Sequence, residues 1–188
     1  MIRKDDYEMF VTPIRVIDLD ENEQKEIQQH YADVWDEIPY NGESKVKTTW
    51  GYPKQPVDMS PLLEKIIVSN LDGFIERITN MAAVALLKDH WLQEYNHGGV
   101  HAPHHHPGSL VSGVYYIESN NLGSPLTFYN PNPAQHFMNY ATYSSRVECW
   151  QGRLVLFPSW LLHGVPECRN EETVRRVTAF NIEEDHNG

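Results

Sequence analysis

The stretch from His101 to Ile117 reads HAPHHHPGSLVSGVYYI, and it decides the fold that we expect for this chain. Its first part holds four histidines in six residues, and residues 110–117 are rich in the β-branched and aromatic residues that favour a strand. In extended backbone, side chains two residues apart project from the same face. His104 and His106 can therefore point together into a β-structure while His105 points away.

Short strand-like runs separated by Gly, Pro and Asn extend from about residue 83 to residue 182. Before them, the pattern predicts a helix over residues 20–38 and a second helix that begins at Ser60-Pro61. Many short strands after two helices predict a mainly β (α+β) jelly-roll barrel with the helices packed on one outer face. We expect one domain over residues 1–188, with helical support over about 20–80 and a β core over about 83–182.

Charge and composition exclude several functional classes. The formal net charge is −11, so a partnership with free nucleic acid, which needs a basic surface, is not expected. No apolar run is long enough to cross a membrane, and the first residues contain no apolar signal core, which predicts a cytoplasmic protein. Exposed strand edges of a small barrel often pair, and this favours a homodimer.

A third histidine completes a candidate metal site. His163 follows the strand predicted over residues 154–157 and the turn over residues 158–160, so a β-barrel could bring it next to His104 and His106. A histidine-rich polar loop and a structural zinc site are the alternatives. Structural zinc sites usually have a closed set of four ligands that include cysteines. From the residues alone, the three imidazoles are a candidate site for one metal ion, and both alternatives stay open.

Three segments together resemble a family of small oxygenases that depend on 2-oxoglutarate and Fe(II). They are HHHPGSLVSGVYYI, GRLVLFPSWLLHGV and RRVTAFN, within about residues 85–182. The resemblance implies a double-stranded β-helix, a metal held by His104, His106 and His163, and the co-substrates 2-oxoglutarate and dioxygen, with ascorbate as a supporting reductant. It implies an oxidoreductase, a dioxygenase that hydroxylates or otherwise oxidises an unidentified small molecule or peptide side chain.

The resemblance also implies where 2-oxoglutarate binds. Its distal carboxylate would lie deep in the barrel, where a guanidinium and hydrogen-bond donors must meet the buried charge. Arg176 and Thr178 share one strand face and resemble the R-x-S/T pair of the superfamily, although a one-residue slip would replace Arg176 by Arg175. Tyr116 is implied as a second donor to this carboxylate, and Ser112, on the same face, as a residue that lines the pocket.

Two other readings remain open from the sequence. The wider superfamily commonly uses two histidines and a carboxylate, whereas His106 stands at the acidic position here. The spacing from Gly98 to His163 also resembles the metal motifs of cupins, which would use the same histidines without 2-oxoglutarate. A non-catalytic barrel that binds a structural metal is the second alternative.

Overall fold

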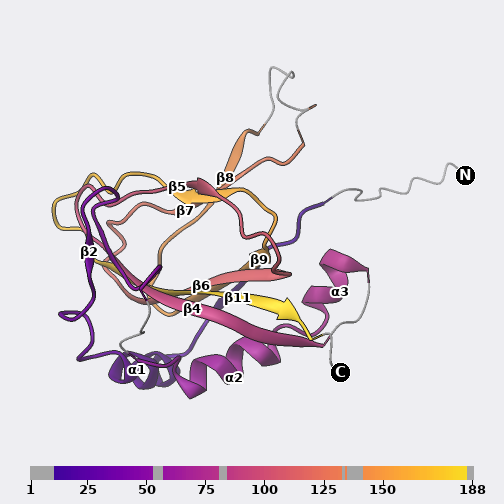
Figure 1. Ribbon diagram of the computed structural model, residues 1–188, viewed down its shortest axis with the longest axis horizontal. Helices are drawn as coiled ribbons and strands as arrows, with labels where there is room; N and C mark the ends of the chain where they lie inside the picture. Colours follow the sequence, from indigo (N-terminus) through magenta and orange to yellow (C-terminus); the bar gives the residue numbers. More distant parts are fainter. Residues whose placement is uncertain (1–10, 53–56, 81–83, 133, 135–141, 186–188) are drawn as a thin grey trace, which may run out of the picture.

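Two antiparallel sheets lie face to face in the computed structural model, which describes residues 11–52, 57–80, 84–132, 134 and 142–185 (Figure 1). This arrangement confirms the predicted jelly roll. The seven-stranded sheet has the order β1-β9-β6-β11-β4-β3-β2, and the four-stranded sheet has the order β5-β10-β7-β8. The strands are β1 Arg15–Asp18, β2 Tyr40–Asn41, β3 Val46–Thr48, β4 Ala85–Tyr95, β5 His101–His104, β6 Val111–Ser119, β7 Leu126–Tyr129, β8 Ser144–Val147, β9 Arg153–Pro158, β10 His163–Val165 and β11 Arg175–Glu184.

Alternating side chains of the large sheet feed two separate cores. On β9, Leu154 and Leu156 belong to the core between the sheet and the helices, whereas Val155 and Phe157 belong to the core between the two sheets. This period-two division follows from the pleat of a strand. The second core is the one that surrounds the cavity described below, and the first stabilises the sheet from outside.

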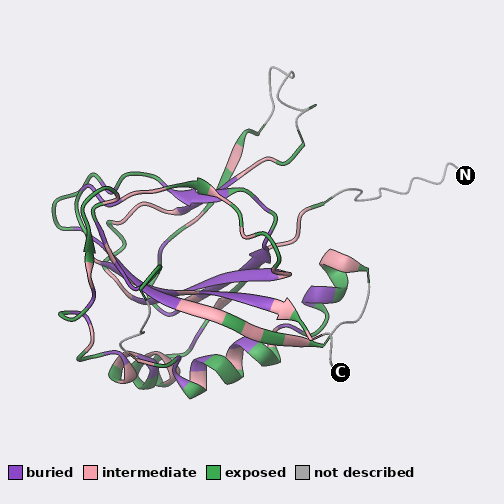
Figure 2. Cartoon of the chain, viewed as in Figure 1, coloured by how far each residue is buried: buried purple, intermediate pink, exposed green. Residues whose placement is uncertain are grey.

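The helices cover the outer face of the large sheet, as the sequence predicts. They are α1 Glu21–His30, α2 Pro61–Ser69 and α3 Phe74–Thr79. Figure 2 shows that α1 and α2 keep exposed residues on the side away from the sheet. Ile27 of α1 and Leu63 and Ile67 of α2 are buried in the core against the sheet. Complete burial of such an aliphatic side chain contributes about 1.5–3 kcal/mol.

Local signals explain where these helices begin and end. Asp20 caps α1 through a reciprocal capping box with Glu23, and Ser60 caps α2 with Pro61 in its first turn. The helix predicted over residues 20–38 is shorter than expected, because α1 ends at His30. The second predicted helix is interrupted before α3 at Gly73, which has a φ of 66° that favours glycine.

No helix among the described residues is long and apolar enough to cross a membrane. The β-branched and aromatic residues over 7–18 also predict a strand or strand pair. Its described part, from residue 11 on, forms β1 from Arg15, and residues 7–10 lie outside the described residues.

Candidate metal centre and co-substrate cavity

The small sheet and the loop that follows β5 bring the three predicted metal ligands together. His104 ends β5 and pairs directly with His163, the first residue of β10. His106 lies just beyond β5, where its backbone N–H donates to the carbonyl oxygen of Ser159 at 2.9 Å. Residues 59 positions apart in the sequence are thus neighbours because β5 and β10 are adjacent antiparallel strands.

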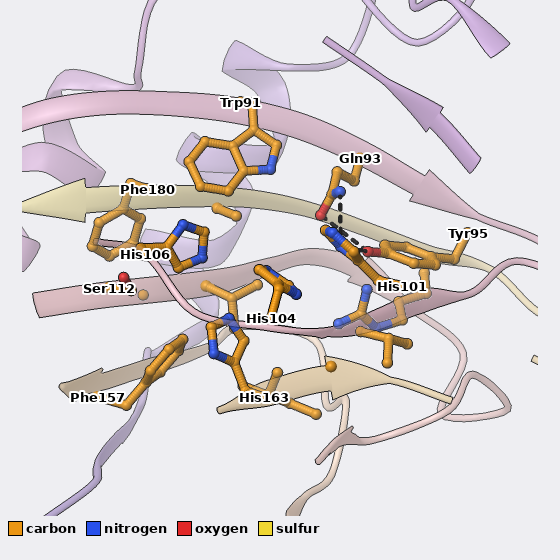
Figure 3. A pocket seen from close by; sticks show the side chains of 17 residues that line it. Trp91, Gln93, Tyr95, His101, His104, His106, Ser112, Phe157, His163 and Phe180 are labelled. Atoms are coloured by element: carbon orange, nitrogen blue, oxygen red, sulfur yellow. Dashed lines mark hydrogen bonds between the residues drawn. The ribbon is translucent and has the colours of Figure 1, made fainter. Parts of the chain in front are cut away.

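The three imidazoles converge on one point. Their potential ligand atoms all lie within 4.8 Å of one another. The ring centroids of His104 and His163 are 4.4 Å apart, those of His104 and His106 4.9 Å, and those of His106 and His163 5.2 Å. His105, as predicted, is exposed and is not part of the group. Figure 3 shows the three rings gathered at one end of the cavity.

Backbone carbonyls orient two of these rings. Nδ1 of His104 lies 2.9 Å from the carbonyl oxygen of Ala102, and Nδ1 of His163 lies 2.8 Å from that of Leu161. A carbonyl oxygen can only accept, so Nδ1 carries the proton and Nε2 keeps a free lone pair. Hydrogen bonds of this kind fix the tautomer of metal-binding histidines.

Burial keeps the cluster uncharged at neutral pH. Desolvation lowers the pKa of His163 to about 3 and that of His106 to about 4, with a further lowering by the neighbouring histidines. The pKa of His104 is lowered too, again chiefly by burial. Neutral imidazoles with oriented Nε2 atoms fit a divalent transition metal such as iron, and three protein ligands leave coordination positions open for other molecules.

A cavity extends from the histidines between the two sheets, and its wall on β4 was not anticipated from the sequence. Trp91, Gln93 and Tyr95 alternate along β4 and all line this cavity. The hydroxyl of Tyr95 donates to Oε1 of Gln93 at 3.1 Å, and it also lies 3.2 Å from Nδ1 of His101. His101 in turn stacks on His104, with ring centroids 4.2 Å apart. Alternation of W-x-Q-x-Y along one strand was the available signal for this wall.

The far end of the cavity holds a buried guanidinium, that of Arg175. The side chain lines the cavity and Arg175 is 1% exposed. Its guanidinium carbon lies 4.3 Å from the ring centre of Tyr95 and 5.1 Å from that of Tyr116. Within the described part of the chain, Nε and Nη1 of Arg175 have no hydrogen-bond partner and no carboxylate forms an ion pair with it. A buried cation without a counter-charge is costly, so this group favours an anionic ligand.

The orientation predicted for Arg176 and Thr178 is wrong by one residue. Arg176 lies on the opposite face of β11, where its Nε donates to Glu94 at 2.7 Å and its Nη1 to Glu118 at 2.8 Å. Thr178 pairs with Leu92 and Tyr115, whose side chains belong to the core under the helices. The two residues do share a face, as expected, but this face is the outer one, so neither lines the cavity.

The other two predicted residues lie on the inner face. Tyr116 is fully buried beside the guanidinium of Arg175. Burial raises the pKa of its hydroxyl, an effect that the charge of Arg175 partly opposes. Ser112 lines the cavity, and its hydroxyl donates to Oδ1 of Asn181 at 2.7 Å and lies 2.8 Å from Oγ of Ser159. Ser112 therefore supports the loop that holds His106.

Sequence comparison identifies a family. Residues 89–181 match the model of the family described as "Putative 2OG-Fe(II) oxygenase". This match covers both histidine segments and residues 175–181 of β11. A search of curated proteins gave no match.

Solved structures with the same fold share little sequence with this chain. HygX from Streptomyces hygroscopicus, solved with nickel and 2-oxoglutarate bound, is 14% identical with a TM-score of 0.63, over 93% of this chain and 84% of HygX. A 2OG-Fe(II) oxygenase family oxidoreductase from Burkholderia pseudomallei is 11% identical, with a TM-score of 0.60 over 90% of this chain and 84% of its own. A prolyl hydroxylase from Trichoplax adhaerens, in complex with a hypoxia inducible factor peptide fragment, is 15% identical, with a TM-score of 0.57 over 90% and 83%. These likenesses establish the double-stranded β-helix.

Proposed function

Since this chain belongs to the family of 2OG-Fe(II) oxygenases, we propose that it couples the oxidative decarboxylation of 2-oxoglutarate to the oxidation of a second substrate. His104, His106 and His163 would hold the iron. The observation that supports this best is the pairing of a convergent histidine triad with an unpaired buried guanidinium in one cavity. A dicarboxylate that chelates a metal at one end needs a cation at the other.

Arg175, rather than Arg176, would bind the distal carboxylate. Its guanidinium is buried in the cavity and lacks an anionic partner among the described residues, whereas Arg176 already has two. The fork of a guanidinium can pair with both oxygens of a carboxylate. Tyr116, packed beside Arg175, is placed to donate its unpartnered hydroxyl to the same carboxylate.

The protein's own contribution would be to bind, orient and exclude water. Iron bound by the histidines would supply the redox chemistry, in which one oxygen atom of dioxygen goes to succinate as 2-oxoglutarate loses carbon dioxide, and the other is left for the oxidation of the second substrate. Phe157 and Phe128 pack beside His163, with Phe157 4.6 Å away between ring centres, and shield that side of the metal centre. All three metal ligands are neutral, so the ion would keep its full charge for an anionic co-substrate.

An anaerobic titration tests this function. Fe(II) is added to the metal-free protein with and without 2-oxoglutarate, and the visible charge-transfer absorption of the chelate is followed; oxygen is then admitted and succinate is measured. We expect absorption that requires both additions, and we expect His163→Ala to abolish it while His105→Ala, an exposed neighbour, does not. Tight metal binding that is unresponsive to 2-oxoglutarate would contradict the proposal and favour a cupin-type or structural metal site.

Three further expectations concern the whole protein. We propose that residues 1–188 fold as one domain, that the protein is cytoplasmic, and that it forms a homodimer. Coincident unfolding transitions followed by tryptophan fluorescence and circular dichroism test the first. Cell fractionation tests the second, and light scattering across a range of concentrations tests the third.

A further inference from the structure

Trp91 lies at the metal end of the cavity. It stands on the inner face of β4, opposite Ala179 of β11, and is 3% exposed. Its ring centre lies 5.7 Å from that of His106. Arg175 pairs with Tyr95, four residues further along β4, so Trp91 and Arg175 mark opposite ends of the same wall. Figure 3 shows the indole beside the histidine cluster, with its six-membered ring on the side of His106 and its nitrogen on the side of Gln93.

The indole N–H of Trp91 is buried and has no hydrogen-bond partner among the described residues. The same is true of only one other residue that lines the described cavity, Arg175. The polar groups between them are occupied, because Gln93, Tyr95 and His101 bond with one another. An unsatisfied buried donor is unfavourable and needs an explanation, and here the acceptor has to come from a molecule in the cavity.

Packing fixes the direction of this donor. The ring of Trp50, which is 54% exposed, lies 4.6 Å from the ring of Trp91 between centres, and His106 contacts the indole as well. Ala179, paired opposite Trp91, has only a methyl group and lines the same cavity. The indole is therefore held in the cavity wall, with its N–H unpartnered, before a ligand binds.

We propose that Trp91 is a positioning residue that donates a hydrogen bond to the carboxylate of 2-oxoglutarate at the metal end. This inference rests on the proposed function, which places the distal carboxylate at Arg175 and the 2-oxo acid group at the histidines. The unpartnered donors, Trp91 at one end and Arg175 with Tyr116 at the other, then match the two ends of one dicarboxylate. Trp91 fixes the rotation of the 2-oxo acid group about the metal, and Arg175 fixes how deep the molecule lies.

Binding measurements on the metal-loaded protein without oxygen test the contact. Trp91→Phe keeps an aromatic ring and removes only the donor, and we expect it to weaken 2-oxoglutarate binding about tenfold to a hundredfold, the range for a hydrogen bond to a charged group. Metal affinity should stay within about twofold of wild type. Trp150→Phe is the matched control, since Trp150 is exposed and lies outside the cavity. It should bind 2-oxoglutarate as wild type does.

A truncated ligand locates the contact at the metal end. 2-Oxobutyrate has the 2-oxo acid group and lacks the distal carboxylate. Trp91→Phe should weaken its binding by the same factor as for 2-oxoglutarate, whereas Arg175→Met should affect 2-oxoglutarate alone. A loss for 2-oxoglutarate without a loss for 2-oxobutyrate would overturn the placement of Trp91.

The indole proton itself gives a readout independent of any variant's folding. The chain has five tryptophans, so protein with ¹⁵N-labelled indoles and diamagnetic Zn(II) should show five N–H resonances. Adding 2-oxoglutarate should move the resonance of Trp91, identified by its loss in Trp91→Phe, downfield. If no indole resonance moves downfield while 2-oxoglutarate binds, Trp91 is not a donor to it. If wild type binds no 2-oxoglutarate at all, the proposed function fails instead.

Discussion

Replacing each of the two adjacent arginines by methionine should separate ligand binding from stability. Arg175→Met removes the buried guanidinium that the co-substrate would meet. Truncating one member of a buried, hydrogen-bonded charge pair costs about 2–5 kcal/mol, so the Kd for 2-oxoglutarate should rise at least about thirtyfold. The ligand-free protein should lose little stability, because Arg175 is 1% exposed and no carboxylate pairs with it in the described part of the chain. Methionine fills similar space without a charge to desolvate.

Arg176→Met should have the opposite profile. It removes the ion pairs with Glu94 and Glu118 and leaves the 5% exposed Glu94 with Lys47 and Asn96 as partners, each at 3.2 Å. Breaking a fully buried pair costs about 3–5 kcal/mol. The side chains of Arg176 and Glu118 are 29% and 44% exposed, so solvent screens part of this, and we expect a loss of about 1–3 kcal/mol.

Two measurements on the same preparations decide between the arginines. Calorimetric titration of the metal-loaded protein without oxygen gives the Kd for 2-oxoglutarate, and urea unfolding of the metal-free protein gives the free energy of unfolding. If Arg176→Met loses the co-substrate while Arg175→Met still binds it as wild type does, the assignment of the inner face of β11 to co-substrate binding is refuted.

The remaining predictions concern the supports of the site. Ser112→Ala leaves the buried Oδ1 of Asn181 without its donor and should lower the free energy of unfolding in urea by about 1–3 kcal/mol; an unchanged midpoint would show that this bond contributes nothing. Gly164→Ala places a methyl group 2.8 Å from the carbonyl oxygen of His101 and should weaken metal binding by separating β5 from β10, whereas Gly42→Ala, with open space around it, should bind metal normally. Burial alone would raise the pKa of Glu94, but the hydrogen bond and charge of Arg176 hold this pKa below the ordinary value of a glutamate. In the pH range where a free glutamate titrates, the folded state thus binds fewer protons than the unfolded state. The difference in the free energy of unfolding between wild type and Arg176→Met, measured in urea, should therefore be largest above about pH 5. This difference should become smaller as the pH falls toward 3. A gap that widens on acidification would contradict the sign of this shift.

The sequence predicts the metal ligands well because their positions depend on simple rules. The H-x-H pattern at a strand end puts His104 and His106 on one side whatever the exact register, and His163 needs only adjacency of two strands. The helix caps at Asp20 and Ser60 are equally local signals. The ends of helices are harder to predict from the sequence, since α1 stops at His30 without a proline or glycine to mark its end.

The alternation of apolar and polar residues along β11 does not show which side chains point to the cavity, because both faces of this strand are buried. Val177 belongs to the core between the sheets and Ala179 lines the cavity, whereas Phe180 and Ile182 belong to the core beneath the helices, so apolar residues occur on each side. Side-chain size was the usable signal. A strand next to a ligand cavity needs a small residue such as Ala179 on its inner face. Placing Ala179 on the inner face also places Arg175, four residues earlier, on that face, and it turns Arg176 outward.

The charge of the cavity is opposite to that of the chain around it. Three neutral imidazoles leave the two positive charges of a metal uncompensated, and Arg175 adds a third, whereas the chain as a whole carries −11. A dianion approaching from solution therefore meets repulsion over the outer surface and attraction only within the last few ångströms. Dissolved ions strongly screen the repulsion by the outer surface, because the Debye length is about 10 Å at 0.1 M salt. They screen the attraction inside the buried cavity much less. Added salt would then speed capture of the co-substrate, the reverse of the usual behaviour of an enzyme that attracts its charged substrate from a distance.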